Sequence, residues 1–229
     1  MDTDVWHVLA AAVRSADRRS ARTGRRPKYT DALIVKMYLW SVWHDRPLCW
    51  ACERTHYNGS FRPRQLPSVA QFSRRVRTQR VRDMLAAVNA YLTRAVPSVA
   101  LAFFDGKPLI LRRQSQDATA KVGYASDGFA KGYKLHALAN ADGFITAFSV
   151  QSMNVSEVHE ARQLAQYVPA RTLVLADANY DSAKLYQAVN ARGATLLTRL
   201  KGQPSRDPTQ LQRMGPARRL AIRLWQRYA

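Results

Sequence analysis

After Pro97 the spacing of hydrophobic residues changes from a helical to an extended pattern, and two of the apolar runs that follow end in an aspartate. The run Val99–Phe104 is followed by Asp105-Gly106, and the run Arg171–Ala176 is followed by Asp177. Short apolar runs of this kind are typical of buried strands. Because a mixed sheet can place the two strands side by side, we expect Asp105 and Asp177 to lie together at one edge.

The rest of this region supplies the other elements of such a sheet. Asp142-Gly143 separates two alternating segments, which predicts a β-hairpin. The expected order is strand, hairpin, helix, strand, helix, strand. The hairpin is expected at 131–140 and 144–150, the helices at 154–168 and 182–190, and the last strand at 194–200. Gly193 is expected to end the second helix. This order predicts an α/β fold with a mixed sheet and flanking helices.

Before Pro97 the pattern is helical. A short amphipathic stretch covers Trp6–Val13, Thr30 is placed to begin a helix, and Ser68–Gln71 matches a capping box that begins another. The latter helix is strongly basic, with Arg74, Arg75, Arg77 and Arg80. We expect residues 1–97 to form a helical, helix-turn-helix-like DNA-binding domain and residues 98–229 a separate core. The alternative for the arginines is a solvated face on a packing helix.

The formal net charge of +20 indicates a polyanionic partner. Cationic side chains attract phosphates and release the counterions bound to them, and arginine grips phosphate through two hydrogen bonds. Arg112 and Arg113 follow the first strand and are candidates for phosphate contacts. Lys134 and His136 share one face of a strand, which either faces DNA or forms an exposed polar surface. The run Arg18–Arg26 is predicted to be turn-like, either an arm on phosphates or a solvated linker.

Two aspartates brought together repel each other unless a cation lies between them. Magnesium is the expected cation, since it prefers oxygen ligands and accepts a few carboxylates together with substrate phosphate. Two such ions about 3.5–4 Å apart can stabilise the attacking and leaving oxygens of a phosphodiester displacement. The alternatives are structural, because Asp105-Gly106 is a common turn pair and Asp177 can cap the helix that follows Tyr180.

Cys49 and Cys52 form a CxxC pair flanked by His44 and His56. Four potential ligands within such a short segment raise the possibility of a zinc site. The segment also reads as a helix rich in Trp and Tyr, which favours two small cysteines buried in a core.

Four motifs in this order resemble the core of bacterial insertion-sequence transposases of the DDE class. They are Phe103-Phe104-Asp105-Gly106, Gly132-Tyr133-Lys134-Leu135-His136, Ala141-Asp142-Gly143 followed by Asn154, and the segment Leu173–Ser182. Leu185–Gly193 resembles the helix that follows the second aspartate in that family. The likeness covers roughly residues 99–201 and is weaker over the helical region before them.

The resemblance implies an RNase-H-like core and two magnesium ions held by an Asp-Asp-Glu set. Manganese is expected to be able to substitute for magnesium. Asp105 and Asp177 match the first two acids. It further implies cleavage at transposon ends and attack of the freed 3′-hydroxyl on target DNA, with double-stranded DNA as partner and a homodimer as a common working state.

The third acid departs from the family pattern. No Asp or Glu follows Asp207, and Leu224–Ala229 looks like the start of the Tyr/Arg/Glu/Lys signature that supplies the glutamate. Glu157 and Glu160 precede the second aspartate and lie in the wrong element for this role. We therefore expect a C-terminally truncated chain with an incomplete site. The rival functions are an inactive DNA-binding derivative and an RNase-H-like nuclease.

The longest apolar stretch, Ala32–Trp43, is short and contains Lys36, so no membrane span is expected. The N-terminus contains Asp2 and Asp4 and lacks the pattern of a signal peptide. The expectation is a cytoplasmic protein associated with the nucleoid.

Overall fold

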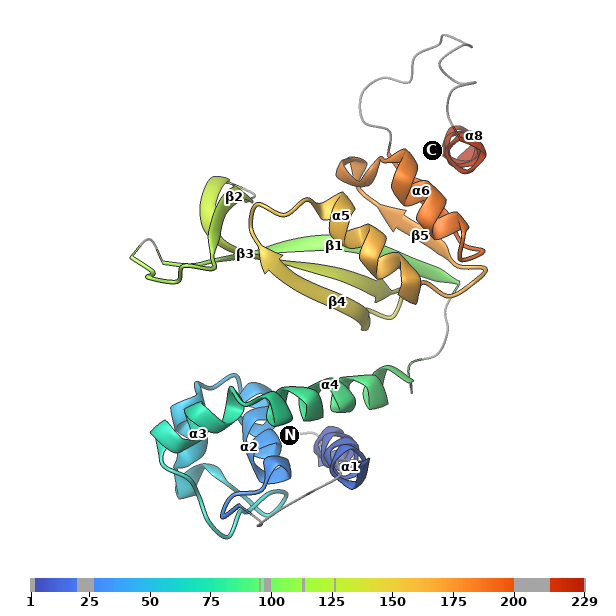
Figure 1. The fold of residues 1–229 in the computed structure, drawn as a ribbon. Helices are drawn as coiled ribbons and strands as arrows, with labels where there is room; N and C mark the ends of the chain where they lie inside the picture. Colours follow the sequence, from blue (N-terminus) through green and yellow to red (C-terminus); the bar gives the residue numbers. More distant parts are fainter. Residues whose placement is uncertain are drawn as a thin grey trace. The chain divides into compact units, whose positions relative to one another are not determined.

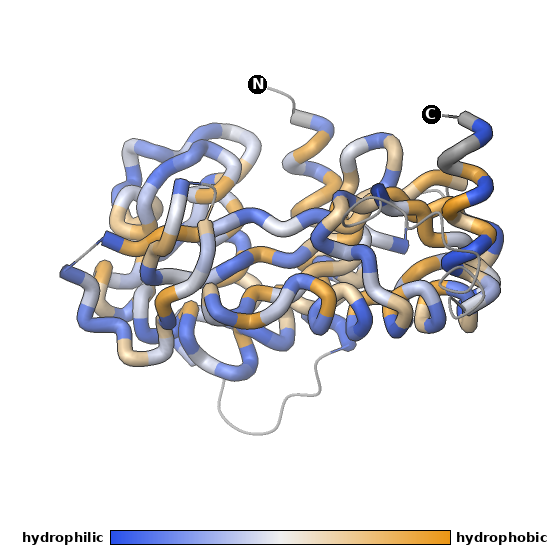
Figure 2. The backbone as a smooth tube through the Cα atoms, turned by 90° about the horizontal axis from the view of Figure 1, so that it is seen from above, coloured by the Kyte–Doolittle hydropathy of each residue, from blue (hydrophilic) through white to orange (hydrophobic). Residues whose placement is uncertain are grey.

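The computed structural model describes residues 3–19, 27–94, 96, 100–112, 114–125, 127–199 and 215–228. The chain divides into two compact units, Met1–Ala95 and Val96–Ala229. Each unit has its own cluster of buried hydrophobic residues. Hydrophobic and hydrophilic residues are interspersed along the helices and strands of both units, as the tube in Figure 2 shows.

The regular elements described in the first unit are all helices (Figure 1), and an isolated β-bridge joins Asn58 to Phe61. Its elements are α1 (Thr3–Arg19), α2 (Asp31–Trp43), the short 3-10 helices η1 (Leu48–Cys52) and η2 (Arg54–His56), α3 (Val69–Val76) and α4 (Gln79–Arg94). The turn-like character expected for Arg18 and Arg19 is wrong, since both lie in the last turn of α1. Arg22, Arg25 and Arg26 lie outside the described residues.

Both predicted helix starts in this unit are confirmed. The Thr30 hydroxyl accepts a hydrogen bond from the Leu33 amide at the start of α2. At α3 the capping box is complete, because the Ser68 hydroxyl accepts from the Gln71 amide while the Gln71 side chain accepts from the Ser68 amide. These bonds satisfy amide groups that have no partner inside the helix, and they fix where each helix begins.

The core of the first unit is built around Trp40, which is fully buried. Its ring packs edge-on against Trp6 at 4.8 Å between centroids, and its indole N–H donates to the His56 carbonyl at 3.0 Å. His44 and His56 pack against the rings of Trp40 and Trp50 at 4.4 Å. These contacts draw the segment after α2 back onto the helices.

The two cysteines do not both lie in this core. Cys49 is exposed and Cys52 is partly buried. The expectation of two buried cysteines is therefore wrong for Cys49, which lies on the outer side of the 3-10 helix η1.

The second unit is a mixed sheet covered by helices (Figure 1). Its elements are β1 (Leu101–Ile110), β2 (Lys121–Ala125), β3 (Gly128–Asn140), β4 (Ile145–Ser152), α5 (Glu157–Leu164), η3 (Ala165–Tyr167), β5 (Leu173–Ala176), η4 (Ala178–Tyr180), α6 (Ala183–Asn190), β6 (Thr195–Thr198) and α8 (Pro216–Tyr228). The strand order is β2-β3-β1-β5-β6, with β4 also paired to β3.

The directions of the strands confirm the predicted fold class. The strands β1, β3 and β4 are antiparallel neighbours, and β5 and β6 run parallel to β1. This arrangement is the RNase-H-like mixed sheet with flanking helices. The helices α5 and α6 pack on the face of the sheet formed by buried residues of five strands, among them Ala102, Phe104, Leu138, Ala147, Val174 and Leu196. No described helix has the length and apolar character needed to cross a membrane.

Two expectations about the strands are wrong. The first strand does not stop at Asp105 but continues to Ile110, because β3 pairs with it along its length, with Asp105 opposite Ala137 and Gly106 opposite His136. Asp105-Gly106 is thus inside a ladder and not in a turn. The strand β2, which pairs with the first part of β3, was not expected at all.

Candidate carboxylate site beside strands β1 and β5

The register of the two parallel strands gives Asp105 and Asp177 equivalent positions along neighbouring chain segments. The last pair of the β1–β5 ladder is Phe103 opposite Leu175, and each aspartate lies two residues further along its chain. Asp105 lies inside β1, whereas Asp177 follows the last residue of β5. Both aspartates are exposed. That the two carboxylates share ions on one side of the sheet stays a prediction.

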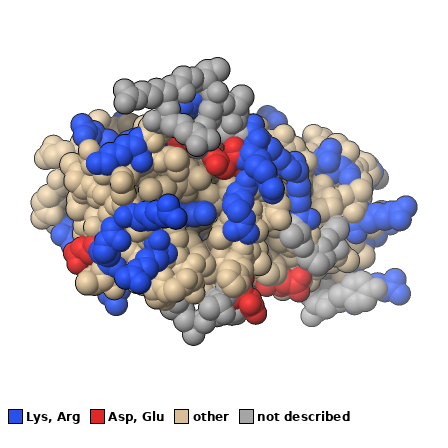
Figure 3. All heavy atoms as spheres, turned by 90° about the horizontal axis from the view of Figure 1, so that it is seen from below, with Lys and Arg blue, Asp and Glu red and all other residues tan. Residues whose placement is uncertain are grey.

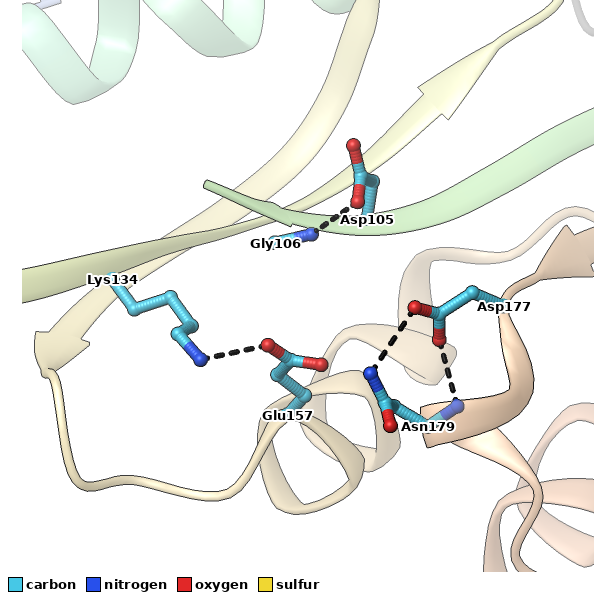
Figure 4. Close-up of polar contacts among 6 residues, drawn as sticks. All are labelled: Asp105, Gly106, Lys134, Glu157, Asp177 and Asn179. Atoms are coloured by element: carbon cyan, nitrogen blue, oxygen red, sulfur yellow. Dashed lines mark hydrogen bonds and ion pairs between the residues drawn. The ribbon is translucent and has the colours of Figure 1, made fainter. Parts of the chain in front are cut away.

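Local hydrogen bonds orient both carboxylates (Figure 4). One oxygen of Asp105 accepts from the Gly106 amide at 2.8 Å. Asp177 accepts from the Asn179 amide at 2.8 Å and from the Asn179 side chain at 3.2 Å. Asp177 therefore caps η4. The structural alternative, that it caps the helix after Tyr180, is wrong, because that helix is α6 and its N-cap is Ser182. Since an ionised carboxylate has about four acceptor positions, capping leaves room for a cation.

Tyr180, the last residue of η4, has a buried hydroxyl group without a hydrogen-bond partner among the described residues. Burial raises the pKa of this phenol, and the negative charges of Glu157, Asp105 and Asp177 raise it further. All three acids are thus near enough to one hydroxyl to disfavour its ionisation. Tyr180 therefore keeps a neutral O–H group, which is buried next to Gly106.

Glu157, which was expected to lie in the wrong element because it precedes Asp177, lies beside Gly106. A Cβ atom added to Gly106 would lie 3.4 Å from a Glu157 carboxylate oxygen and 3.4 Å from the Tyr180 hydroxyl. The other partner of Glu157 is Lys134, whose ammonium nitrogen is 2.7 Å from its carboxylate. In Figure 4, Glu157 reaches from α5 toward Lys134 while Asp105 points away from it.

The burial of Lys134 and His136 corrects the exposed polar face expected for them. Their exposed fractions are 7% and 2%, because this side of β3 lies under α5. A DNA contact by Lys134 would require breaking its ion pair with Glu157. For His136, burial lowers the pKa and the Lys134 charge lowers it further, while Glu160 and Glu157 oppose the shift. Neither ring nitrogen has a hydrogen-bond partner among the described residues.

The arginines predicted to bind DNA differ in their surroundings. Arg74, Arg77, Arg80 and Arg112 are exposed, whereas Arg75 donates to the buried carboxylate of Asp31 at 2.5 Å. Arg75 therefore joins α3 to α2, and Arg113 lies outside the described residues. Lys and Arg side chains spread over the face in Figure 3, where few Asp and Glu are visible. Within the described ranges, no group of three or more His, Cys, Asp or Glu residues is arranged to hold a metal ion.

A family model described as "Transposase DDE domain" matches residues 100–228. These residues include Asp105, Asp177 and every element of the second unit. The chain belongs to the DDE transposase family. A search of curated proteins finds no match.

Two solved structures resemble this DDE transposase chain at low identity. The piggyBac transposase synaptic complex with hairpin DNA is 11% identical, with a TM-score of 0.46 over 94% of this chain and 46% of that one. The simian T-cell lymphotropic virus intasome, in complex with the PP2A regulatory subunit B56 gamma, is 12% identical, with a TM-score of 0.28 over 61% of this chain and 50% of that one. The transposase chain thus spans about half the length of either protein chain.

Proposed function

We propose that the chain is a DNA transposase that cleaves transposon ends and joins the freed 3′-hydroxyl strand to target DNA. The observation that supports this proposal is the register of β1 and β5, in which two exposed aspartates lie at equivalent positions, each two residues after the last pair of the ladder. Membership of the DDE transposase family supports it. In this proposal Asp105 and Asp177 are the first two catalytic acids.

The two aspartates fit magnesium, and manganese as a substitute. Carboxylate oxygens are the ligands these cations prefer, and both side chains are exposed to solvent and substrate. When bound, two such ions would stabilise charge on the attacking and leaving oxygens of a phosphodiester. The chain holds the carboxylates ready through the Gly106 and Asn179 amides. Tyr180 stays neutral and adds no negative charge to the site.

Double-stranded DNA is the proposed substrate, both as transposon ends and as target. The net charge of +20 favours phosphate contacts over the surface as a whole. The exposed Arg74, Arg77 and Arg80 of the first unit and Arg112 of the second are proposed to contact phosphates, with the first unit as the DNA-binding domain. A homodimer acting on paired ends is the proposed assembly.

The test combines metal binding with strand cleavage. The purified chain is incubated with Mn²⁺ or Mg²⁺ and a plasmid carrying the DNA that flanks its gene, and nicking and strand joining are followed on gels. Mn²⁺ binding is measured separately by electron paramagnetic resonance. We expect Asp105→Asn and Asp177→Asn each to reduce cleavage at least 100-fold and to weaken Mn²⁺ binding. Asp142→Asn, an exposed acid in the β3–β4 turn, is the matched control and should change neither.

Each outcome decides between the candidate functions. Cleavage and joining at the flanking sequences that both variants abolish would support a transposase. Cleavage of any DNA without joining would favour an RNase-H-like nuclease. Tight DNA binding with no cleavage by the unsubstituted chain would overturn the proposed activity and leave a DNA-binding derivative.

A further inference from the structure

We propose that a pocket beside the carboxylate site binds an unpaired nucleobase of the DNA strand, an inference that rests on the proposed function. The pocket has a volume of about 470 Å³ and lies between the β2–β3 hairpin and the start of α5. Its lining includes Tyr124 and Phe129 from the hairpin, Met153 from the loop after β4, Glu157 from α5 and Asn179 from η4. A volume of this size is in the range of pockets that enclose small organic ligands.

The hairpin side of the pocket carries two aromatic side chains with unusually high exposure. Tyr124 and Phe129 are 64% and 80% exposed, although aromatic rings usually contribute most of their surface to a core. They are partners in the β2–β3 ladder, and their rings meet edge to face at 6.1 Å between centroids. Each ring therefore keeps surface available to a planar ligand. Bases stack on such rings whatever their sequence, because every base has an aromatic face.

The wall that carries this aromatic pair is held close to the rest of the domain by Gly123. A Cβ atom at this position would overlap the carbonyl oxygen of Met153, which is itself part of the pocket. Only glycine allows β2 to lie directly against the chain that leaves β4. The pocket is thus a built feature of the fold, since its two sides meet at this contact.

One residue connects the pocket to the carboxylate site. Asn179 lines the pocket and donates a hydrogen bond from its side chain to Asp177 at 3.2 Å. Glu157 lines it too, on the side of β1 that Gly106 faces, whereas Asp105 points away from it (Figure 4). A nucleotide with its phosphate at Asp177 therefore has the pocket beside it, on the other side of Asn179.

Charge around the hairpin fits a nucleic acid strand. Lys121 begins β2 and is exposed, and Arg112 follows β1 and is exposed. The ladders place Lys121 and Ile110 opposite the same residue, Gly132, so both cations lie near the base of the hairpin. The base must be unpaired, because a base inside a duplex has its faces covered by its neighbours and has to leave the stack before it can enter a pocket.

The direct test is photo-cross-linking with the full chain. Random-sequence duplexes carry one 5-iodouracil, either in a three-nucleotide overhang or paired inside a blunt end, and are irradiated at a wavelength that excites this base alone. We expect cross-links from the overhang that peptide mapping assigns to Tyr124 or Phe129, and few from the paired base. Cross-links of the overhang that map elsewhere would overturn the proposal.

Substitutions test whether stacking produces the effect. The double variant Tyr124→Leu with Phe129→Leu keeps an apolar surface but removes the rings, and it should lose about tenfold in its preference for overhang over blunt DNA, measured by fluorescence anisotropy. Tyr124→Phe should keep the preference. Phe148→Ala, an exposed aromatic of β4 outside the pocket, is the control and should keep it too. An unchanged preference in the double variant would contradict the proposal.

The outcomes also separate this proposal from the proposed function. Cross-linking at the aromatic pair without metal-dependent cleavage would support the base pocket and overturn only the transposase activity. Cleavage without such cross-links would overturn only the base pocket. If the double variant instead changes the oligomeric state in sedimentation and leaves DNA preference intact, the hairpin is an interface between copies and the base pocket is wrong.

Discussion

Among single residues, His136 couples the second unit to pH. It is buried beneath α5, with Lys134, Glu157 and Glu160 as the charged groups around it, and burial lowers its pKa. A residue whose pKa is lower in the folded state binds fewer protons there than in the unfolded chain. Its contribution to stability is therefore complete above the unfolded value of about 6.5 and is lost as the pH falls through the folded pKa.

We expect the melting temperature of the protein to fall between pH 7 and pH 5, and this fall to be smaller in His136→Gln. Thermal unfolding followed by circular dichroism at both pH values measures it. His7→Gln, which removes an exposed histidine of α1, is the control and should keep the full pH dependence. An equal dependence in His136→Gln and in the unsubstituted chain would show that His136 is not the responsible group.

Single residues also show where sequence patterns stop being informative. Alternation correctly put Lys134 and His136 on one side of β3, but it could not say which side α5 would cover. The partner of Lys134 is 23 residues away in sequence and comes from a different element. Glu157 was excluded because of its position along the chain, although packing of α5 over β3 places it beside Gly106. Only the fold supplies such information.

At the scale of elements, the boundaries that depend on neighbouring residues were predicted correctly from the sequence. The boundaries that depend on pairing with a distant strand were not. Thr30 and Ser68 begin their helices as expected, because a cap depends on residues three positions apart. Gly193 follows α6 with a positive φ of 71°, as a helix-ending glycine should. Two features depend on pairing with β3: the extension of β1 beyond Asp105, and the strand β2. The pattern of hydrophobic and polar residues in these two segments did not indicate that pairing.

The helix α8 offers a test of how one element is attached. It packs against α6 and β6, and its Arg218 guanidinium lies 2.5 Å from the Asp181 carboxylate, which is 1% exposed. Removing one partner of a buried ion pair leaves a charge in a medium of low polarity. We expect Arg218→Met to lower the free energy of unfolding by about 3–5 kcal/mol, as measured by urea denaturation.

Arg223→Met is the matched control for this substitution, because it removes an exposed arginine from the same helix. It should change the free energy of unfolding by less than about 0.5 kcal/mol. Pairing Arg218→Met with Asp181→Leu should recover part of the loss, because no buried charge is then left behind. Equal, small effects of both arginine substitutions would mean that the ion pair does not hold α8 in place.

For the whole molecule, the net charge of +20 raises the question whether DNA binding depends on total charge or on particular surfaces. The logarithm of the DNA-binding constant falls linearly with the logarithm of salt concentration, and each phosphate contact that a cation makes steepens this negative slope by about 0.9. Arg74, Arg77 and Arg80 are exposed on or beside α3, while Arg75 is held by Asp31. The expectation that all four lie in one helix is wrong, because Arg77 follows α3 and Arg80 lies in α4. The three exposed arginines are thus the ones in this region that are placed to contact DNA.

We expect the triple variant Arg74→Gln, Arg77→Gln, Arg80→Gln to bind duplex DNA more weakly and to reduce the magnitude of the salt slope by up to about 2.7, measured by anisotropy between 50 and 300 mM salt. The triple variant Arg162→Gln, Lys184→Gln, Arg192→Gln is the control, because it removes the same charge from exposed sites on α5 and α6 and after α6. If total charge alone governs binding, the two triples will have equal slopes. If α3 is the DNA-contacting surface, only the first slope will fall, since contacts with phosphate, and not distant charges, release the bound counterions.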